Sequence, residues 1–308
     1  MTNIEIGPFL KSENKTILEL SDVVNKLDKF ILYIRNIIMF RIEKDTQNEE
    51  LTIKVNGNFI PGHILLYLSY FITKVNSITK ITINCTPTVT EHLKNSGFLD
   101  FVNKNNITTK LDSVILPFNR FKNEDISSFG TLMIHNQNKF PNIFFDYPFE
   151  LFANSQEHSN ASYVYTFSQK YPKIGEMDFT IFDDGIGIVE NSLKNGMNCE
   201  IIRQSKFLKN PDDFINIYGL NTIIIILCCV TKYSTRLSGG GEGLFRLSKL
   251  LNEHKGILNI YSGKEFLSIA FNQICNEGSL LDINDIVIKK HSTDSNIHGT
   301  YINFRFNV

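Results

Sequence analysis

A carboxylate and two glycines follow an apolar strand in the second half of the sequence. In the stretch 178–188, DFTIFDDGIGI, Asp183 continues a row of apolar side chains that share one face of a strand. Gly185 and Gly187 supply backbone that can take positive φ and lets a ligand approach closely. This pattern predicts a pocket floor with one buried acceptor, suited to an exocyclic amino group such as that of adenine. A strand that ends in an Asp-Gly turn would have the same sequence pattern, so the prediction of a pocket needs support from other residues.

A second group of polar residues has helical spacing. After Pro148, the residues Glu150, Asn154 and His158 recur every four positions and therefore share one face of a predicted helix. The carboxylate of Glu150 can orient or deprotonate a water, and the amide oxygen of Asn154 can bind Mg²⁺. A solvated polar face would have the same spacing.

A run of glycines precedes a third candidate element. Residues 237–244, LSGGGEGL, lead into a periodic apolar pattern that predicts a helix ending near Gly256. The free N–H groups of such a run, together with the positive end of a helix dipole, favour phosphate binding. No Gly-Lys-Ser/Thr follows, so the run is not a Walker loop, and a flexible connection is the alternative.

A fourth stretch, 298–306, has the alternation of a strand, and Thr300 places a hydroxyl in its apolar row. In this order, the four stretches resemble the motifs of the Bergerat-fold ATPases, the GHKL superfamily of gyrase, the heat-shock chaperone, histidine kinases and mismatch-repair proteins. Glu150-x-x-x-Asn154 is similar to the N-box, Asp183-x-Gly185-x-Gly187 to the first glycine box and 239–244 to the second. The resemblance covers the chain from Pro141 to the C-terminus.

The resemblance implies an ATP-binding domain at 141–308, an α/β sandwich with a lid at about 189–238. The segment 170–175 predicts a hairpin turn between strands at 163–167 and 179–182, so the sheet is expected to be mixed or antiparallel. It implies that Asp183 takes the adenine amino group beside Thr300, that Asn154 binds Mg²⁺ and that Glu150 is catalytic. The other residues that it places at the nucleotide are His158, Gly185, Gly187, Arg236, Gly239, Gly240, Gly241, Gly243 and Leu244.

Two features depart from the family pattern. Glu242 places an acid where the polyphosphate is expected, which puts the details of the phosphate contacts in doubt. No His-Glu-x-x-x-Pro motif precedes the N-box, and His135 is the only nearby histidine upstream. A sensor histidine kinase with its own phosphate acceptor is therefore disfavoured.

The N-terminal half alternates between strand and helix patterns. Strands are predicted at 51–55 and 80–85, and helices at 16–39, 62–74 and 88–101. Such alternation predicts a small α/β domain with parallel strands at 1–120, followed by a connector at 121–140. The domain loosely resembles a STAS domain, including Ser96-Gly97-Phe98 at the end of its second helix. Thr86 and Thr88 could accept phosphate, but turn and N-cap roles are favoured for both.

Composition narrows the class of protein. The 308 residues carry 31 Lys and Arg against 32 Asp and Glu, a net charge of −1, so no basic surface for nucleic acid or anionic lipid is expected. The N-terminus does not resemble a signal peptide, and the longest apolar run, 223–230 within a helix predicted at 214–230, is too short to span a bilayer. Five cysteines without Cys-x-x-Cys spacing favour reduced thiols in a cytoplasmic protein.

These observations predict an ATP-binding protein, a Mg²⁺-dependent ATPase that acts as a nucleotide-driven conformational switch on an unidentified protein partner. Many members of the family work as dimers, so a homodimer stays open. One alternative is a serine/threonine kinase related to anti-sigma-factor kinases, for which the STAS-like half would be the argument. The other is a nucleotide sensor without turnover, which Glu150 argues against because binding alone needs no base.

Overall fold

The computed structural model describes residues 2–6, 15–19, 49–54, 60, 62–74, 78–102, 114–122, 124–230, 242–271, 280–291 and 297–307. The chain divides into two compact units, the first formed by Met1–Asn119 with Tyr165–Gln169 and the second by Arg120–Val164 with Lys170–Val308. The segment 121–140, expected to be a connector, groups with the second unit and contains a helix of its own.

The first unit contains a four-stranded mixed sheet in the order β1-β4-β3-β2. Its strands are β1 (Thr2–Ile6), β2 (Lys15–Glu19), β3 (Glu49–Lys54) and β4 (Ile78–Cys85), and its helices are α2 (Gly62–Lys74), α3 (Pro87–Asn95) and α4 (Phe98–Val102). Strands β2, β3 and β4 are parallel, while β1 is antiparallel to β4. The predicted strand and helix alternation with parallel strands is confirmed.

Two helix predictions in this unit are wrong in part. Residues 16–19 lie in β2 because they pair with β3, and this non-local pairing overrides the helical spacing of the apolar residues; residues 20–39 lie outside the described part. The helix predicted at 88–101 is interrupted at Gly97, which has φ +78° and separates α3 from α4. Thr86 is the N-cap of α3, where its side chain accepts a hydrogen bond from the Val89 amide at 3.3 Å.

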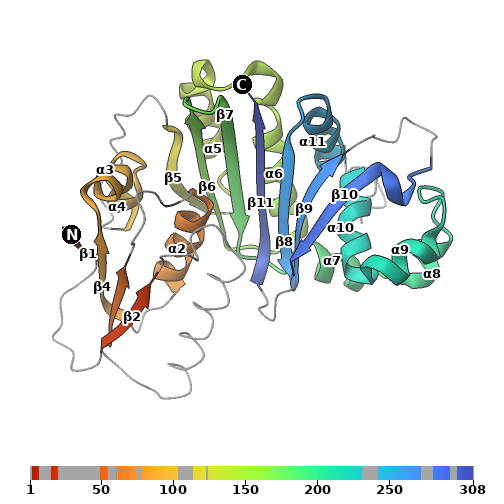
Figure 1. Ribbon diagram of the computed structural model, residues 1–308, viewed down its shortest axis with the longest axis horizontal. Coiled ribbons are helices and arrows are strands. Elements are labelled where there is room, and N and C mark those ends of the chain that lie inside the picture. The colour runs from red at the N-terminus through yellow and green to blue at the C-terminus, as the bar shows by residue number, and fades with distance from the viewer. Residues whose placement is uncertain are drawn as a thin grey trace. The chain divides into compact units, whose positions relative to one another are not determined.

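The seven-stranded sheet has the order β10-β9-β8-β11-β7-β6-β5 (Figure 1). Its strands are β5 (Val114–Lys122), β6 (Tyr163–Tyr171), β7 (Glu176–Asp183), β8 (Ile257–Gly263), β9 (Glu265–Phe271), β10 (Ile286–His291) and β11 (Ile297–Asn307). Strands β7, β11, β8, β9 and β10 pair antiparallel, which is the second of the two arrangements expected from the sequence. A short turn at 172–175, rather than a helical crossover, joins β6 to β7, as the sequence predicts.

The helices of the second unit lie between its strands along the chain. They are α5 (Ile126–His135), α6 (Tyr147–His158), α7 (Ile188–Lys194), α8 (Cys199–Arg203), α9 (Pro211–Tyr218), α10 (Leu220–Val230) and α11 (Glu242–Glu253), with short 3₁₀ turns η1 (Gln137–Lys139), η2 (Asn142–Phe144) and η3 (Ile283–Asp285). Helices α5, α6 and α11 lie behind the strands in Figure 1, and α6 contacts both β7 and α11.

The helix predicted at 214–230 is two helices. Gly219 has φ +80°, which ends α9 and starts α10 in a new direction. The expectation that this stretch is core is confirmed for α10, in which Ile223, Ile224, Ile225 and Ile226 are buried.

Aromatic packing orients α6. Leu151 and Phe152 are buried, and the Phe152 ring stacks on Phe129 of α5 with centroids 4.8 Å apart and meets Phe121 edge-on at 5.8 Å. Because these apolar residues occupy the inner face of the helix, Glu150 and Asn154 are turned away from the core.

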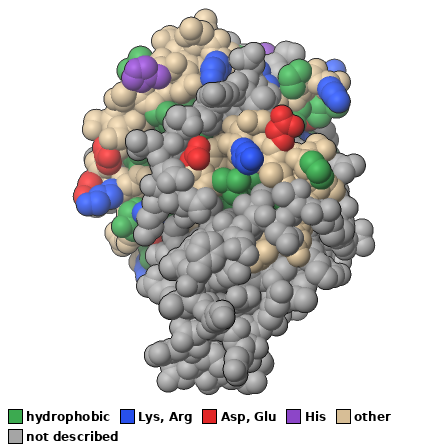
Figure 2. Space-filling view, turned by 90° about the vertical axis from the view of Figure 1, so that its left-hand side faces the viewer, with side chains coloured by type: hydrophobic (Ala, Val, Ile, Leu, Met, Phe, Trp, Pro, Cys, Tyr) green, Lys and Arg blue, Asp and Glu red, His purple; other side chains and the backbone are tan. Residues whose placement is uncertain are grey.

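No described helix is long and apolar enough to cross a membrane. On the described surface of the face shown in Figure 2, positive and negative side chains are interspersed, without a broad patch of one sign. That distribution agrees with the net charge of −1.

Candidate functional site

Asp183 ends β7 and is 4% exposed. The antiparallel register places it opposite Thr300 of β11, which is also buried. One carboxylate oxygen accepts a hydrogen bond from the Gly185 amide at 3.0 Å, and the other lies 3.5 Å from the hydroxyl of Ser155 on α6. The structure thus brings together the end of β7, β11 and α6 at one acidic side chain.

Burial raises the pKa of Asp183 to about 7, because a carboxylate loses its hydration inside the protein. Hydrogen bonds from the Gly185 amide, the Ser159 hydroxyl and the Thr300 amide oppose this rise. The group therefore titrates near neutral pH, and its ionised form is available as an acceptor above pH 7.

The glycines after Asp183 lie where side chains do not fit. A Cβ on Gly185 would overlap the carbonyl oxygen of Ser159, whose partner is the Ile186 amide at 2.7 Å. Gly187 has φ +84°, and a Cβ there would lie 2.7 Å from both the Gly299 carbonyl oxygen and the Ser262 hydroxyl. The turn between β7 and α7 is thus closely packed against β11 and β8.

The end of the glycine-rich stretch 239–244 lies against α6. A Cβ on Gly243 would lie 3.1 Å from Cβ of Glu150 and 3.3 Å from Nδ2 of Asn154, so α11 begins in close contact with these two residues. Leu244 is buried, as are Leu247 and Leu251 further along the helix. Burial of this apolar stripe places the start of α11 beside the polar face of α6.

Some predicted residues lie outside this description. Arg236, Gly239, Gly240 and Gly241 belong to 231–241, which lies outside the described residues. The backbones of His158 and Glu242 are helical, but their side chains are likewise outside the described part. The described residues therefore include Asp183 and Thr300, predicted to bind the base, and Glu150 and Asn154 of the predicted N-box. The phosphate-binding loop stays a prediction.

No protein-family model matches the sequence, and no curated protein matches it. The case for function therefore comes from the residues and their geometry.

The region at 189–238, expected to be a lid, is largely helical where it is described. It holds most of α7 and all of α8, α9 and α10. The start of α10 is fixed by Thr222, whose hydroxyl donates to Glu265 at 2.9 Å, and Lys290 pairs with the same carboxylate at 2.8 Å. These contacts and the burial of α10 attach this helix to β9 and β10 of the second unit.

Four polar residues at the site are not found by the sequence motifs. Ser155 and Ser159 approach Asp183 from α6, and the Ser262 hydroxyl accepts a hydrogen bond from the Val189 amide at 3.4 Å. Asp184 accepts hydrogen bonds from the Ser162 and Tyr163 amides, both at 2.8 Å. The spacing of Ser155 and Ser159, four residues apart on one helix face, is the only sequence signal for any of them.

Proposed function

We propose that the second unit binds ATP with Mg²⁺ and hydrolyses it slowly, as a nucleotide-driven conformational switch on a protein partner. The observation that carries the proposal is the convergence of four separate stretches of sequence. Asp183 lies opposite Thr300 and within reach of Ser155, while Gly243 lies against Glu150 and Asn154 of the same helix. Chance spacing along the chain would not bring these residues to one place.

In this proposal the carboxylate of Asp183 accepts a hydrogen bond from the amino group of adenine. A buried carboxylate that accepts this further hydrogen bond favours adenine over a base without the amino group. Thr300, its neighbour across the strand pair, supplies a hydroxyl next to the same position. Gly185 and Gly187 let the turn that follows Asp183 pack closely against Ser159, Gly299 and Ser262.

The residues present fit Mg²⁺ brought in by the nucleotide. Within the described residues there is no cluster of three acidic, histidine or cysteine side chains that could hold a metal unaided. Mg²⁺ is commonly held by one or two protein oxygens together with phosphates and waters, and the amide oxygen of Asn154 suits that role. Bound in this way, the ion would neutralise charge on the phosphates.

Glu150 is the proposed catalytic residue. Its side chain is exposed, lies one helical turn from Asn154, and is next to the start of the helix that follows the glycine run. From there a carboxylate can orient and activate a water for attack on the terminal phosphate. We also propose a Bergerat-type arrangement for this unit, a STAS-like fold for the first unit and a homodimer.

The test incubates the full chain with γ-labelled ATP and Mg²⁺ and follows free phosphate and protein-bound label in the same samples. Glu150→Ala should retain nucleotide binding and lose turnover by about 100-fold or more. Glu91→Ala, an exposed glutamate on α3 of the first unit, is the control and should behave like wild type.

The outcomes separate the alternatives. Phosphate release that needs Glu150 supports the ATPase. Label on the protein or on an added partner would move the serine/threonine kinase to first place, and binding without either signal would favour the sensor. A chain that binds no nucleotide would contradict the proposal altogether.

A further inference from the structure

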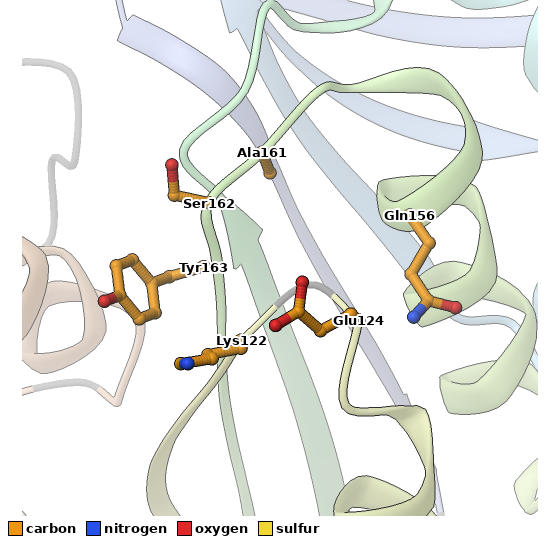
Figure 3. A pocket seen from close by; sticks show the side chains of 6 residues that line it. All are labelled: Lys122, Glu124, Gln156, Ala161, Ser162 and Tyr163. Atoms are coloured by element: carbon orange, nitrogen blue, oxygen red, sulfur yellow. The ribbon is translucent and has the colours of Figure 1, made fainter.

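A polar cavity of about 570 Å³ opens on the second unit. It lies between the C-terminal half of α6, the loop that follows it and the end of β5 (Figure 3). Its lining residues are Lys122, Glu124, Gln156, Ala161, Ser162 and Tyr163. None of them is a residue proposed above to contact ATP, and the volume is within the range of about 300–1,000 Å³ that is common for small-molecule sites.

Two opposite charges line this cavity without neutralising each other. Lys122 and Glu124 are both exposed, and within the part of the chain that the structure describes they form no ion pair together. In the close view, Glu124 lies between Lys122 and Gln156 (Figure 3). The guanidinium of Arg120 lies 4.6 Å from the centre of the Tyr163 ring, which places a second cation near that ring.

The wall of the cavity is connected to the end of β7. The carboxylate of Asp184 accepts hydrogen bonds from the amides of Ser162 and Tyr163, and the Asp184 amide donates to the Tyr163 carbonyl at 3.2 Å. At the other end of the same loop, the Ile186 amide donates to the Ser159 carbonyl at 2.7 Å. The loop at 159–163 and the turn after Asp183 therefore form one hydrogen-bonded unit.

We infer that this cavity binds a small zwitterion of the α-amino-acid class as an effector. Glu124 takes the ammonium group, Lys122 takes the carboxylate, and the Gln156 amide and Ser162 hydroxyl contact the ligand's side chain. A zwitterion can pair with both lining charges at once, whereas a ligand with one charge pairs with only one of them and an apolar ligand with neither. Occupancy changes the affinity for nucleotide through the loop shared with Asp184; this second step rests on the proposed function.

Binding is tested on the full chain by calorimetry and ligand-observed NMR with the twenty common L-amino acids as probes. At least one should bind, and its N-acetyl and carboxamide derivatives should bind at least 10-fold more weakly because each lacks one charge. Glu124→Gln and Lys122→Met should each weaken binding at least 10-fold. The controls are Glu91→Gln on α3 and Lys173→Met in the β6–β7 turn, both exposed and remote in sequence from the cavity.

The inference is overturned if no amino acid binds. It is also overturned if the blocked derivatives bind to wild type as tightly as the free amino acid does, and the two cavity variants bind the free amino acid as tightly as wild type does. Coupling is tested by measuring nucleotide affinity with and without a saturating amino acid, and equal affinities would overturn the coupling. A chain that binds the amino acid but no nucleotide would contradict the proposed function while supporting the cavity assignment.

Discussion

At Asp183, the cost of burying a carboxylate outweighs the hydrogen bonds that the group accepts. Asp183 is 4% exposed, and burial raises its pKa from 3.8 to about 7. When the pKa of a carboxyl is higher in the folded than in the unfolded protein, the group stabilises the fold at pH values below its unfolded pKa. That contribution is lost as the pH rises through the folded pKa. The wild-type protein should therefore lose stability between about pH 4 and pH 7 from this group alone, on the order of 4 kcal/mol.

Asp183→Asn removes that pH-dependent loss. Relative to wild type, the variant should be more stable at pH 8 than at pH 5, because only the wild type must keep a buried carboxylate ionised at the higher pH. It should also lose nucleotide binding, since the amide replaces one acceptor oxygen with a donor. Urea unfolding at both pH values and calorimetry with ATP measure the two effects; unchanged ATP affinity would refute the pocket assignment.

Gly187 and Gly175 form a matched pair for backbone strain. Both have positive φ, but a Cβ on Gly187 would meet Gly299 and Ser262 at 2.7 Å, whereas nothing lies within 4 Å of one on Gly175. Gly175→Ala should lower the free energy of unfolding by only about 1 kcal/mol, because alanine is strained only by the left-handed backbone conformation. Gly187→Ala should cost about 3 kcal/mol or more, because it adds overlap that a packed turn cannot relieve. Denaturant unfolding compares them, and equal losses would contradict the close packing of this turn.

At the scale of elements, the contact between α6 and α11 decides whether the candidate catalytic residues lie together. Apolar residues of both helices are buried, including Phe152 of α6 and Leu247 of α11. The absence of a side chain at Gly243 lets the start of α11 lie against Glu150 and Asn154. The distance between the two helices therefore sets the position of Glu150, the proposed water-activating residue, relative to Gly243.

Gly243→Ala should separate these helices slightly. Its methyl group would lie 3.1 Å from Cβ of Glu150, closer than ordinary contact, so turnover should fall about 10-fold as Glu150 is displaced. Stability should change little, because alanine favours a helix over glycine by about 1 kcal/mol and offsets the crowding. Phosphate release and urea unfolding test both expectations.

Gly130 in α5 is the control for that substitution. A Cβ there would lie 3.6 Å from the Phe149 ring, an ordinary contact, so Gly130→Ala should stabilise the protein by about 0.5–1 kcal/mol and leave turnover unchanged. If both alanine variants retained full turnover, the proximity of α11 to Glu150 would have no catalytic meaning.

For the molecule as a whole, the two units are not consecutive in sequence. Residues 165–169 of β6 belong with the first unit, where Phe167 stacks on Phe118 with ring centroids 4.2 Å apart and Tyr165 meets Tyr70 at 5.8 Å. A break of the chain between 119 and 120 therefore leaves buried aromatic residues without their partners.

A fragment that begins at residue 120 should consequently be less stable and more prone to aggregate than the full chain, because Tyr165 and Phe167 would lose apolar partners. Thermal unfolding and size-exclusion chromatography of the two proteins provide the comparison. A fragment that is as stable and monomeric as the full chain would show that residues 165–169 do not depend on the first unit.

The sequence by itself determined the elements whose pattern is local. Helical spacing located α2, α6 and α11, alternation located β7 and β11, and glycines flanked the expected turns. In these segments the side-chain period alone distinguishes helix from strand, so neighbours in the chain carry enough information.

Only the tertiary structure decided how those elements meet. Pairing with β3 makes residues 15–19 a strand, and antiparallel register sets Thr300 opposite Asp183. Packing of α11 on α6 brings Gly243 to Glu150. Register and packing depend on residues far apart in the chain, whose preferences no local window contains. The charged cavity beside α6 arises in the same way, because its lining comes from three separate segments.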